Sequence, residues 1–297
     1  MAIYSIKDLE ILTGIKAHTI RVWERRYNLV DPGRTNTNIR CYSDEDLKRL
    51  LNVSILNQNG FKISKIAGLD DAQLRNRVLD LCMDSRNNNV MIESLLVAML
   101  ELDELKFSRV LASSIIKVGF EGTIEEVLFP FLERIGVLWQ SGTINPAQEH
   151  FITNLIRQKL MVAIDSEMQN TPVTRKQRIL FFTPEQEWHD MGLLFFSLLA
   201  RKAGFEIIYL GASVPLADLN VVRSIRPFHA LFFTMVGARK KDDFYRLIRE
   251  IDHEFPNFPV FVSGLQFKEQ KPLLPPNFVL CSSAATFKQS LEKLFKD

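Results

Sequence analysis

The sequence predicts a multidomain protein of α and α/β class, in which two helical parts precede a parallel α/β domain. Residues 1–70 contain short helical segments with polar turns, and residues 71–170 carry Leu, Ile, Val and Met at helical three- and four-residue spacing. Residues 178–297 alternate short apolar runs with amphipathic stretches, as parallel sheets covered by helices do. Because 297 residues suit two or three domains of ~100–200 residues, we expect three domains with these boundaries.

Composition narrows the class of protein. Hydrophobic residues make up 46% and charged residues 24%, which is ordinary for a folded globular chain. Apolar runs such as 193–200 are shorter than the ~20 residues of a membrane span, and residues 1–8 lack the pattern of a signal peptide. Three distant cysteines form neither a disulfide framework nor a CxxC metal site: Cys41, Cys82 and Cys281. We expect a cytoplasmic protein without a membrane partner.

The first two helices form a helix-turn-helix pattern. Ser5 and Asp8 have the spacing of a capping box, and Ile6, Leu9 and Leu12 supply an apolar stripe. Gly14 ends this helix, because glycine readily adopts the left-handed conformation of a tight turn. A second helix is expected over 17–27, which completes the pattern.

The second helix and the segment after it are basic. Between residues 16 and 40 there are six Lys or Arg residues and two acidic ones. Ile20 and Trp23 can face inward while Arg21 and Arg25 share the outer face. Such a cluster is typical of a polyanion-binding element or, equally well from charge alone, of a solvated helix face.

The rest of the first domain is predicted to be a wing and two more helices. Residues 34–42 are polar and cationic, as expected of a hairpin wing beside a DNA backbone. Residues 43–46 cap a third helix over 47–57, and a short fourth helix contains Ile63 and Ile66.

Four motifs in these residues resemble the winged-helix domain of MerR-type transcription regulators. They are Tyr4–Leu9, Thr13–Ile15, Thr19–Tyr27 and Arg40–Ser43. The resemblance implies binding of double-stranded promoter DNA as a dimer or higher oligomer; a helical protein-docking module is the alternative. The expected DNA-binding residues are Lys16, His18, Thr19, Arg21, Arg25, Arg26, Arg34, Arg40 and Tyr42.

The last domain is predicted to contain five buried strands. A hydrophilic stretch at 167–177, which contains Pro172, is the expected linker before them. The strands are expected at Arg178–Thr183, Glu206–Leu210, Ala230–Met235, Val260–Ser263 and Phe278–Cys281.

Two groups of residues are candidates for a binding site. Trp139 is followed ten residues later by Glu149 and His150; taken alone, such a Trp is usually core and such a pair usually surface. His189 follows the first strand, where open α/β sheets bind ligands. Glu187 can hold one ring nitrogen while the other coordinates a metal, and Gly192 permits a close backbone approach, although a hydrogen-bonded loop histidine is the plainer alternative.

Together the two groups resemble the cobalamin-binding module of methionine synthase and its relatives, a helical bundle followed by a flavodoxin-like (Rossmann-type) domain. Behind a MerR-type head, the arrangement is similar to the CarH/LitR group of light-sensing regulators. The resemblance implies adenosyl- or methylcobalamin with His189 as the lower cobalt ligand. Trp139, Glu149 and His150 would cover the upper face. It also implies tetramers that bind DNA with alkylcobalamin and dissociate in light.

The sequence departs from this pattern at several positions. Gln140 stands where a His often follows the bundle Trp, and Glu187 stands where Asp is frequent. A slot for the nucleotide tail is expected beside Thr234, Ser263 and Gly264, where Ser263 replaces a glycine and narrows the slot. Met235 is expected to intrude on it as well.

Two other functions stay open, the first of them because of Ser263 and Gln140. In one, the cobalamin fold has lost its cofactor and senses a regulatory protein partner or another ligand. In the other, the chain is a corrinoid carrier, which the DNA-binding head argues against. No GxGxxG, P-loop or nucleophile-elbow motif occurs, and a substrate-handling barrel would need ~200 more residues. We therefore expect a regulator without catalytic residues.

Overall fold

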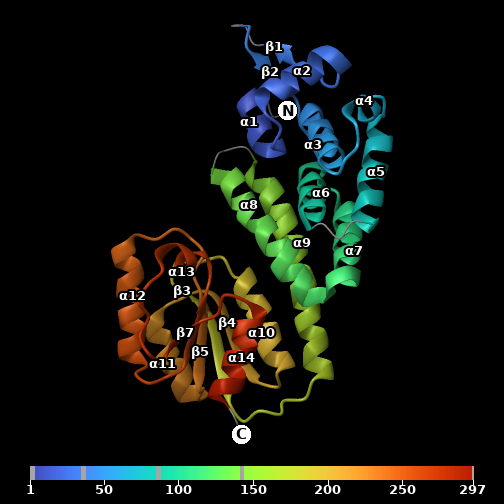
Figure 1. Ribbon diagram of the computed structural model, residues 1–297. Helices are drawn as coiled ribbons and strands as arrows, with labels where there is room; N and C mark the ends of the chain where they lie inside the picture. Colours follow the sequence, from blue (N-terminus) through green and yellow to red (C-terminus); the bar gives the residue numbers. More distant parts are fainter. Residues whose placement is uncertain (1–3, 35–37, 85–87, 141–143, 296–297) are drawn as a thin grey trace. The chain divides into compact units, whose positions relative to one another are not determined.

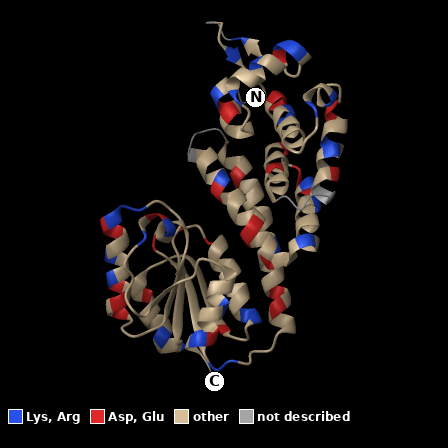
Figure 2. Ribbon diagram, in the orientation of Figure 1, with Lys and Arg blue, Asp and Glu red and all other residues tan. Residues whose placement is uncertain are grey.

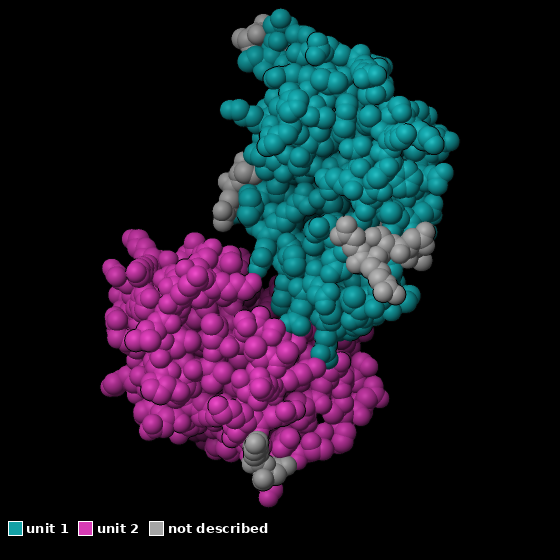
Figure 3. Space-filling model, in the orientation of Figure 1, with its two compact units in different colours: residues 1–155 teal, residues 156–297 magenta. Residues whose placement is uncertain are grey.

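The computed structural model describes residues 4–34, 38–84, 88–140 and 144–295. The chain forms two compact units, residues 1–155 and 156–297 (Figure 3). The boundary falls inside one helix, α9 (Pro146–Asn170). The division into three domains stays a prediction.

The helix-turn-helix forms as predicted (Figure 1). In α1 (Ile6–Thr13), the Ser5 hydroxyl accepts a hydrogen bond from the Asp8 amide, and the Asp8 carboxylate accepts one from the Ser5 amide. Gly14 ends the helix with φ +70°. The second helix, α2, covers Ala17–Tyr27. Sequence was sufficient here because caps and turns are local.

The wing and the next two helices follow. Strands β1 (Gly33–Arg34) and β2 (Arg40–Cys41) pair antiparallel; residues 35–37 of the expected wing lie outside the described residues. Helix α3 (Asp44–Gln58) begins earlier than the expected start at residue 47, because Ser43 caps it in a box with Asp46. The short helix α4 covers Ile63–Ile66.

Helices continue to residue 170, in agreement with the apolar spacing. They are α5 (Asp71–Asp84), α6 (Asn88–Glu101), α7 (Glu104–Thr123), the π-helix η1 (Ile124–Leu128), α8 (Phe129–Gln140) and α9. Helix α6 contacts α3, α5, α7 and α8. Ten of its residues are buried, so α6 is the central helix of the first unit. Because α9 runs to Asn170, the predicted linker begins four residues too early in the chain.

The second unit contains a five-stranded parallel sheet in the order β4-β3-β5-β6-β7. This order is that of flavodoxin-like folds and confirms the predicted fold class. All five expected strands are present, and the second is longer than expected. The strands are β3 (Arg178–Pro184), β4 (Glu206–Val214), β5 (Ala230–Thr234), β6 (Val260–Ser263) and β7 (Phe278–Leu280).

Helices cover both faces of this sheet (Figure 1). On one face, Phe196 of α10 (Met191–Lys202) and Phe287 of α14 (Ala284–Leu294) pack on Phe232, with ring centroids 4.8 and 5.2 Å away. The other face is covered by α11 (Leu216–Ile225), α12 (Lys241–Glu254) and α13 (Leu265–Gln270). Among the described residues, no helix is long and apolar enough to cross a membrane.

The side chain of Met235 lies on the α11–α12 face. It is fully buried in one cluster with Phe233 and Phe244. The side chain of Thr234 points the other way, toward α10, because a Cβ on Gly192 would lie 3.4 Å from its Cγ2. The expectation that Met235 obstructs a slot beside Thr234 is therefore wrong: successive side chains of a strand face opposite sides of the sheet.

Gly264 is required by the packing of two strand ends. Its φ is +114°, and a Cβ there would lie 2.2 Å from the Met235 carbonyl oxygen. Gly264→Ala is expected to lower the free energy of unfolding by about 1–3 kcal/mol, since backbone must move. Urea denaturation of the cofactor-free protein measures the loss. Gly211→Ala is the control, because its φ is also positive but its nearest neighbour is 3.6 Å away; an equal loss in both variants would contradict the clash.

Candidate functional site

Helix α2 presents a cationic outer surface. Ile20 is fully buried, whereas Arg21, Arg25 and Arg26 are exposed, as the spacing predicts. Blue marks the Lys and Arg positions on the ribbon of α2 in Figure 2. Lys16, His18 and Arg34 are exposed as well, and Thr19 is half-buried. These residues are accessible to DNA, and their individual contacts stay predictions.

Two expected DNA-binding residues make contacts within the fold. Arg40 Nε donates to both carboxylate oxygens of Glu24, at 3.1 and 3.2 Å, and so ties strand β2 to helix α2. Tyr42 is 1% exposed, and burial, together with the nearby Glu24 carboxylate, raises its pKa to about 12. The burial of this ring in the core of the head argues against Tyr42 as a DNA contact, and its role stays untested.

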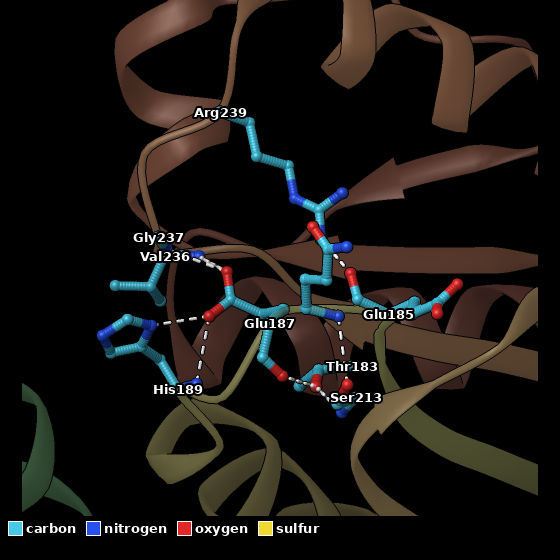
Figure 4. Close-up of polar contacts among 9 residues, drawn as sticks. Thr183, Glu185, Glu187, His189, Ser213, Val236, Gly237 and Arg239 are labelled. Atoms are coloured by element: carbon cyan, nitrogen blue, oxygen red, sulfur yellow. Dashed lines mark hydrogen bonds and ion pairs between the residues drawn. The ribbon is translucent and has the colours of Figure 1, made fainter.

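A second site lies where the loops after β3 and β5 meet, at the point where the strand order reverses (Figure 4). The Glu187 carboxylate is buried between these loops. Its Oε2 accepts hydrogen bonds from the amides of Val236 and Gly237, both at 2.8 Å. Its Oε1 accepts one from the His189 amide at 3.0 Å and lies 2.6 Å from His189 Nδ1. One carboxylate therefore joins both loops and holds the imidazole.

The charge of Glu187 sets the tautomer of His189. Burial alone raises the pKa of Glu187. The hydrogen bonds from the His189 ring and from three backbone amides outweigh burial and lower the pKa to about 2. At neutral pH the carboxylate only accepts, so Nδ1 donates the proton. In the neutral ring the metal-binding lone pair is then on Nε2, and the side chain is 62% exposed.

Strand β4 also supports this loop. The Thr183 hydroxyl donates to the Glu187 carbonyl at 2.6 Å and accepts from the Ser213 amide at 2.9 Å. The Ser213 hydroxyl accepts from the Gln186 amide at 3.0 Å, and Ser213 has φ +58°. Backbone and side-chain groups of three strand ends thus fix the position of His189.

The residue after His189 is anchored to helix α9. Asp190 is 9% exposed, and one of its carboxylate oxygens forms an ion pair with Arg157. Its other oxygen, Oδ1, and the hydroxyl of Tyr209 are buried without a hydrogen-bond partner in the described part of the chain. The loop and strand β4 therefore each keep one buried polar atom that can form a further hydrogen bond.

The expected slot beside β5 has one such polar atom. Thr234 is 1% exposed, and its hydroxyl is buried without a partner among residues 4–34, 38–84, 88–140 and 144–295. Ser263 pairs with Thr234 in the sheet and donates its hydroxyl to the Cys281 carbonyl at 2.7 Å. These groups fit a corrinoid. The exposed His189 ring suits its cobalt, and the Thr234 hydroxyl, which lies beside Gly192, suits its polar tail.

The candidate residues of the bundle belong to the first unit. Trp139 on α8 is 54% exposed, so it is not a core residue. His150 Nε2 lies 3.4 Å from Glu149 Oε2 on α9, and the His150 side chain is 71% exposed. The side chain of Gln140 lies outside the described residues. The side chains of Trp139 and His150 are therefore accessible to a ligand.

Comparison with known proteins identifies the family. Residues 4–73 match the MerR HTH family of regulatory proteins, and residues 91–163 match the B12 binding domain family. The chain is 32% identical over 270 residues to the HTH-type transcriptional repressor CarH of Myxococcus xanthus, covering 88% of each chain. The chain belongs to the CarH-like family of MerR-type regulators. The repressor CarA of the same organism is 28% identical over 267 residues, covering 89% and 87%.

A solved structure agrees with the fold of this CarH-like chain. The monomethylamine corrinoid protein of Methanosarcina barkeri has a TM-score of 0.52 at 14% identity, covering 70% of this chain and 100% of that chain. At this identity the likeness concerns the fold alone. The predicted MerR-type head and cobalamin as the class of cofactor are confirmed by the two family matches.

Several site residues escaped the sequence analysis. The amides of Val236 and Gly237 give no signal, because every residue except proline has one. Thr183, Ser213 and Arg157 matter only through contacts made across the fold. The need for glycine at position 237 is likewise seen only in the structure, where a Cβ there would lie 3.4 Å from Glu187 Oε2.

Glu187→Gln is expected to lower the free energy of unfolding of the cofactor-free protein by about 1.5–3 kcal/mol. The amide removes the charge, and its NH₂ group faces backbone donors or the ring N–H. Urea denaturation measures the loss. Glu185→Gln is the matched control, since the Glu185 side chain is exposed in the same loop. Equal stability of the two variants would show that the carboxylate does not organise the loops.

Proposed function

We propose that this CarH-like regulator binds alkylcobalamin with His189 as the lower cobalt ligand and uses the cofactor to control self-association and operator binding. The observation that carries this proposal is the buried Glu187 carboxylate, which fixes Nδ1 of His189 as a donor. Nε2 is then the nitrogen suited to cobalt. We also propose light as a signal and the cytoplasm as the location, where promoter DNA is accessible.

The other candidate residues receive complementary roles in this proposal. Trp139, Glu149 and His150 cover the upper face, over the alkyl group. Gly192, Thr234, Ser263 and Gly264 line the slot for the nucleotide tail, where the unused Thr234 hydroxyl donates to it. The cofactor supplies a cobalt–carbon bond that light can break. The protein positions the lower ligand and shields the upper face.

The head binds promoter DNA in this proposal, as a dimer or tetramer. Arg21 and Arg25 reach base edges, and the other exposed groups contact phosphates. Those other groups are Lys16, His18, Thr19, Arg26 and Arg34. Arg40 contributes by holding the wing against α2 through Glu24.

A second candidate function is a regulator that has lost the cofactor and senses a protein partner. Ser263 favours it, because its hydroxyl is bonded to the Cys281 carbonyl beside the slot. The position of Met235 on the opposite face and the unused Thr234 hydroxyl favour cobalamin instead. A corrinoid carrier has no use for the cationic head.

Purified protein given adenosylcobalamin in the dark is expected to retain the cofactor's visible absorbance through gel filtration. It is also expected to elute as a larger oligomer and to bind operator DNA more tightly. Green light is expected to reverse the last two effects. His189→Ala should lose the absorbance and the response, because the lower ligand is absent. Gel filtration with absorbance detection and gel shifts measure all three.

His253→Ala is the matched control for this experiment, since His253 is an exposed histidine of α12. It should behave as the unaltered protein. A colourless protein with unchanged operator affinity would support the cofactor-free alternative. Bound cobalamin without an operator response would support a carrier.

Arg21→Ala and Arg25→Ala are each expected to weaken operator binding by ~1–3 kcal/mol if they contact a base. The reason is the loss of a bidentate donor from the outer face of α2. Gel shifts at fixed salt measure the change. Arg75→Ala is the control, since Arg75 is an exposed arginine of α5. Unchanged affinity would mean that another face of α2 reads the DNA.

A further inference from the structure

Arg134 connects the helix that carries Trp139 to the DNA-binding head. From α8 its guanidinium forms an ion pair with Glu93 on α6. The same group donates to the Leu12 carbonyl oxygen at 2.8 Å, across 122 residues of sequence. Leu12 lies in the last turn of α1, five residues before the first residue of the cationic helix α2. All these residues belong to the first unit.

Both partners of Arg134 depend on it. The last carbonyls of a helix lack partners within the helix and favour a nearby cation. The neighbouring carbonyl, of Thr13, accepts from Ser54 within the head, whereas that of Leu12 is reached by α8. The Glu93 side chain is 13% exposed, and its Oε2 is buried with no partner in the described ranges. Burial raises the pKa of Glu93, and the attraction of Arg134 opposes that rise.

Helix α8 can pass a displacement from one end to the other. Trp139 lies five residues after Arg134, about 140° around the helix and about 7.5 Å along it. Ile135 and Leu138 between them are buried, so α8 packs firmly along one side while Trp139 is exposed. A shift of α8 would withdraw the guanidinium from Leu12, from Glu93 or from both.

We propose that Arg134 is the positioning residue that couples the cofactor state to the DNA-binding head. The inference rests on the proposed function, in which Trp139 covers the cofactor. When α8 moves, Arg134 releases the end of α1 and the turn before α2. Leaving Glu93 without its cation is costly, so the link favours one arrangement of α8 over others.

The test compares full-length Arg134→Met with the unaltered protein. The coupling ratio is the operator Kd without cofactor divided by that with adenosylcobalamin in the dark. Typical ratios are of the order of 5–150, and the variant's ratio should fall to about 1–2. Cobalamin titrations with and without operator must show the same loss, because coupling is reciprocal. Cofactor absorbance should be retained.

Two further variants separate coupling from folding. Glu93→Met combined with Arg134→Met removes the buried carboxylate as well, so this double variant should fold and still lose the coupling. Ser54→Ala removes the neighbouring bond to the Thr13 carbonyl without touching α8, so it should keep the coupling ratio. A normal ratio in either Arg134 variant would overturn the proposal.

Hydrogen exchange of the cofactor-free protein tests the link without the cofactor. Amides from Gly14 to Ala17 should exchange faster in Arg134→Met than in Arg109→Met, which alters an exposed arginine of α7. Equal exchange would overturn the proposal even if cobalamin is bound. Faster exchange in a protein that binds no cobalamin would support the link and refute the proposed function.

Discussion

The site depends on one buried carboxylate that is fully hydrogen bonded. Glu187 follows β3, and its partners Val236 and Gly237 follow β5, so a single charge fixes the two loops that flank the reversal of strand order. An ionised carboxylate is costly to bury, and four hydrogen bonds compensate for that cost here. Without them, neither the tautomer nor the position of His189 would be defined.

Much of the fold could be predicted because its signals are local. The capping box at Ser5, the stop at Gly14 and the buried runs at each strand identify elements within a few residues of the chain. The end of α9 was predicted four residues too early, since a hydrophilic helix end and a linker have the same composition. The kink in α7 at Gly119, with φ +74° and ψ 172°, also went unpredicted.

The candidate site also contains residues that the sequence identifies and residues that only the fold brings together. Glu187 and His189 are recognisable because their chemistry is in their side chains and their spacing. The burial of Tyr42 was not predicted, because it depends on pairing with Tyr4, which lies 38 residues earlier in the chain. The sequence did not show on which face of the sheet the Met235 side chain lies. The backbone amides that donate to Glu187 carry no sequence signal at all.

The carboxylates of Glu187 and Glu93 suit opposite tasks. Glu187 is bonded mostly by backbone amides of its own domain, so its hydrogen bonds do not depend on another helix, which suits the loop that holds the cofactor in the proposed function. Glu93 is held by one side chain from another helix and keeps an oxygen without a partner in the described part of the chain. Its environment therefore changes whenever α8 moves. A regulator needs both: a rigid receptor for the signal, and an interaction whose loss separates two states by a few kcal/mol.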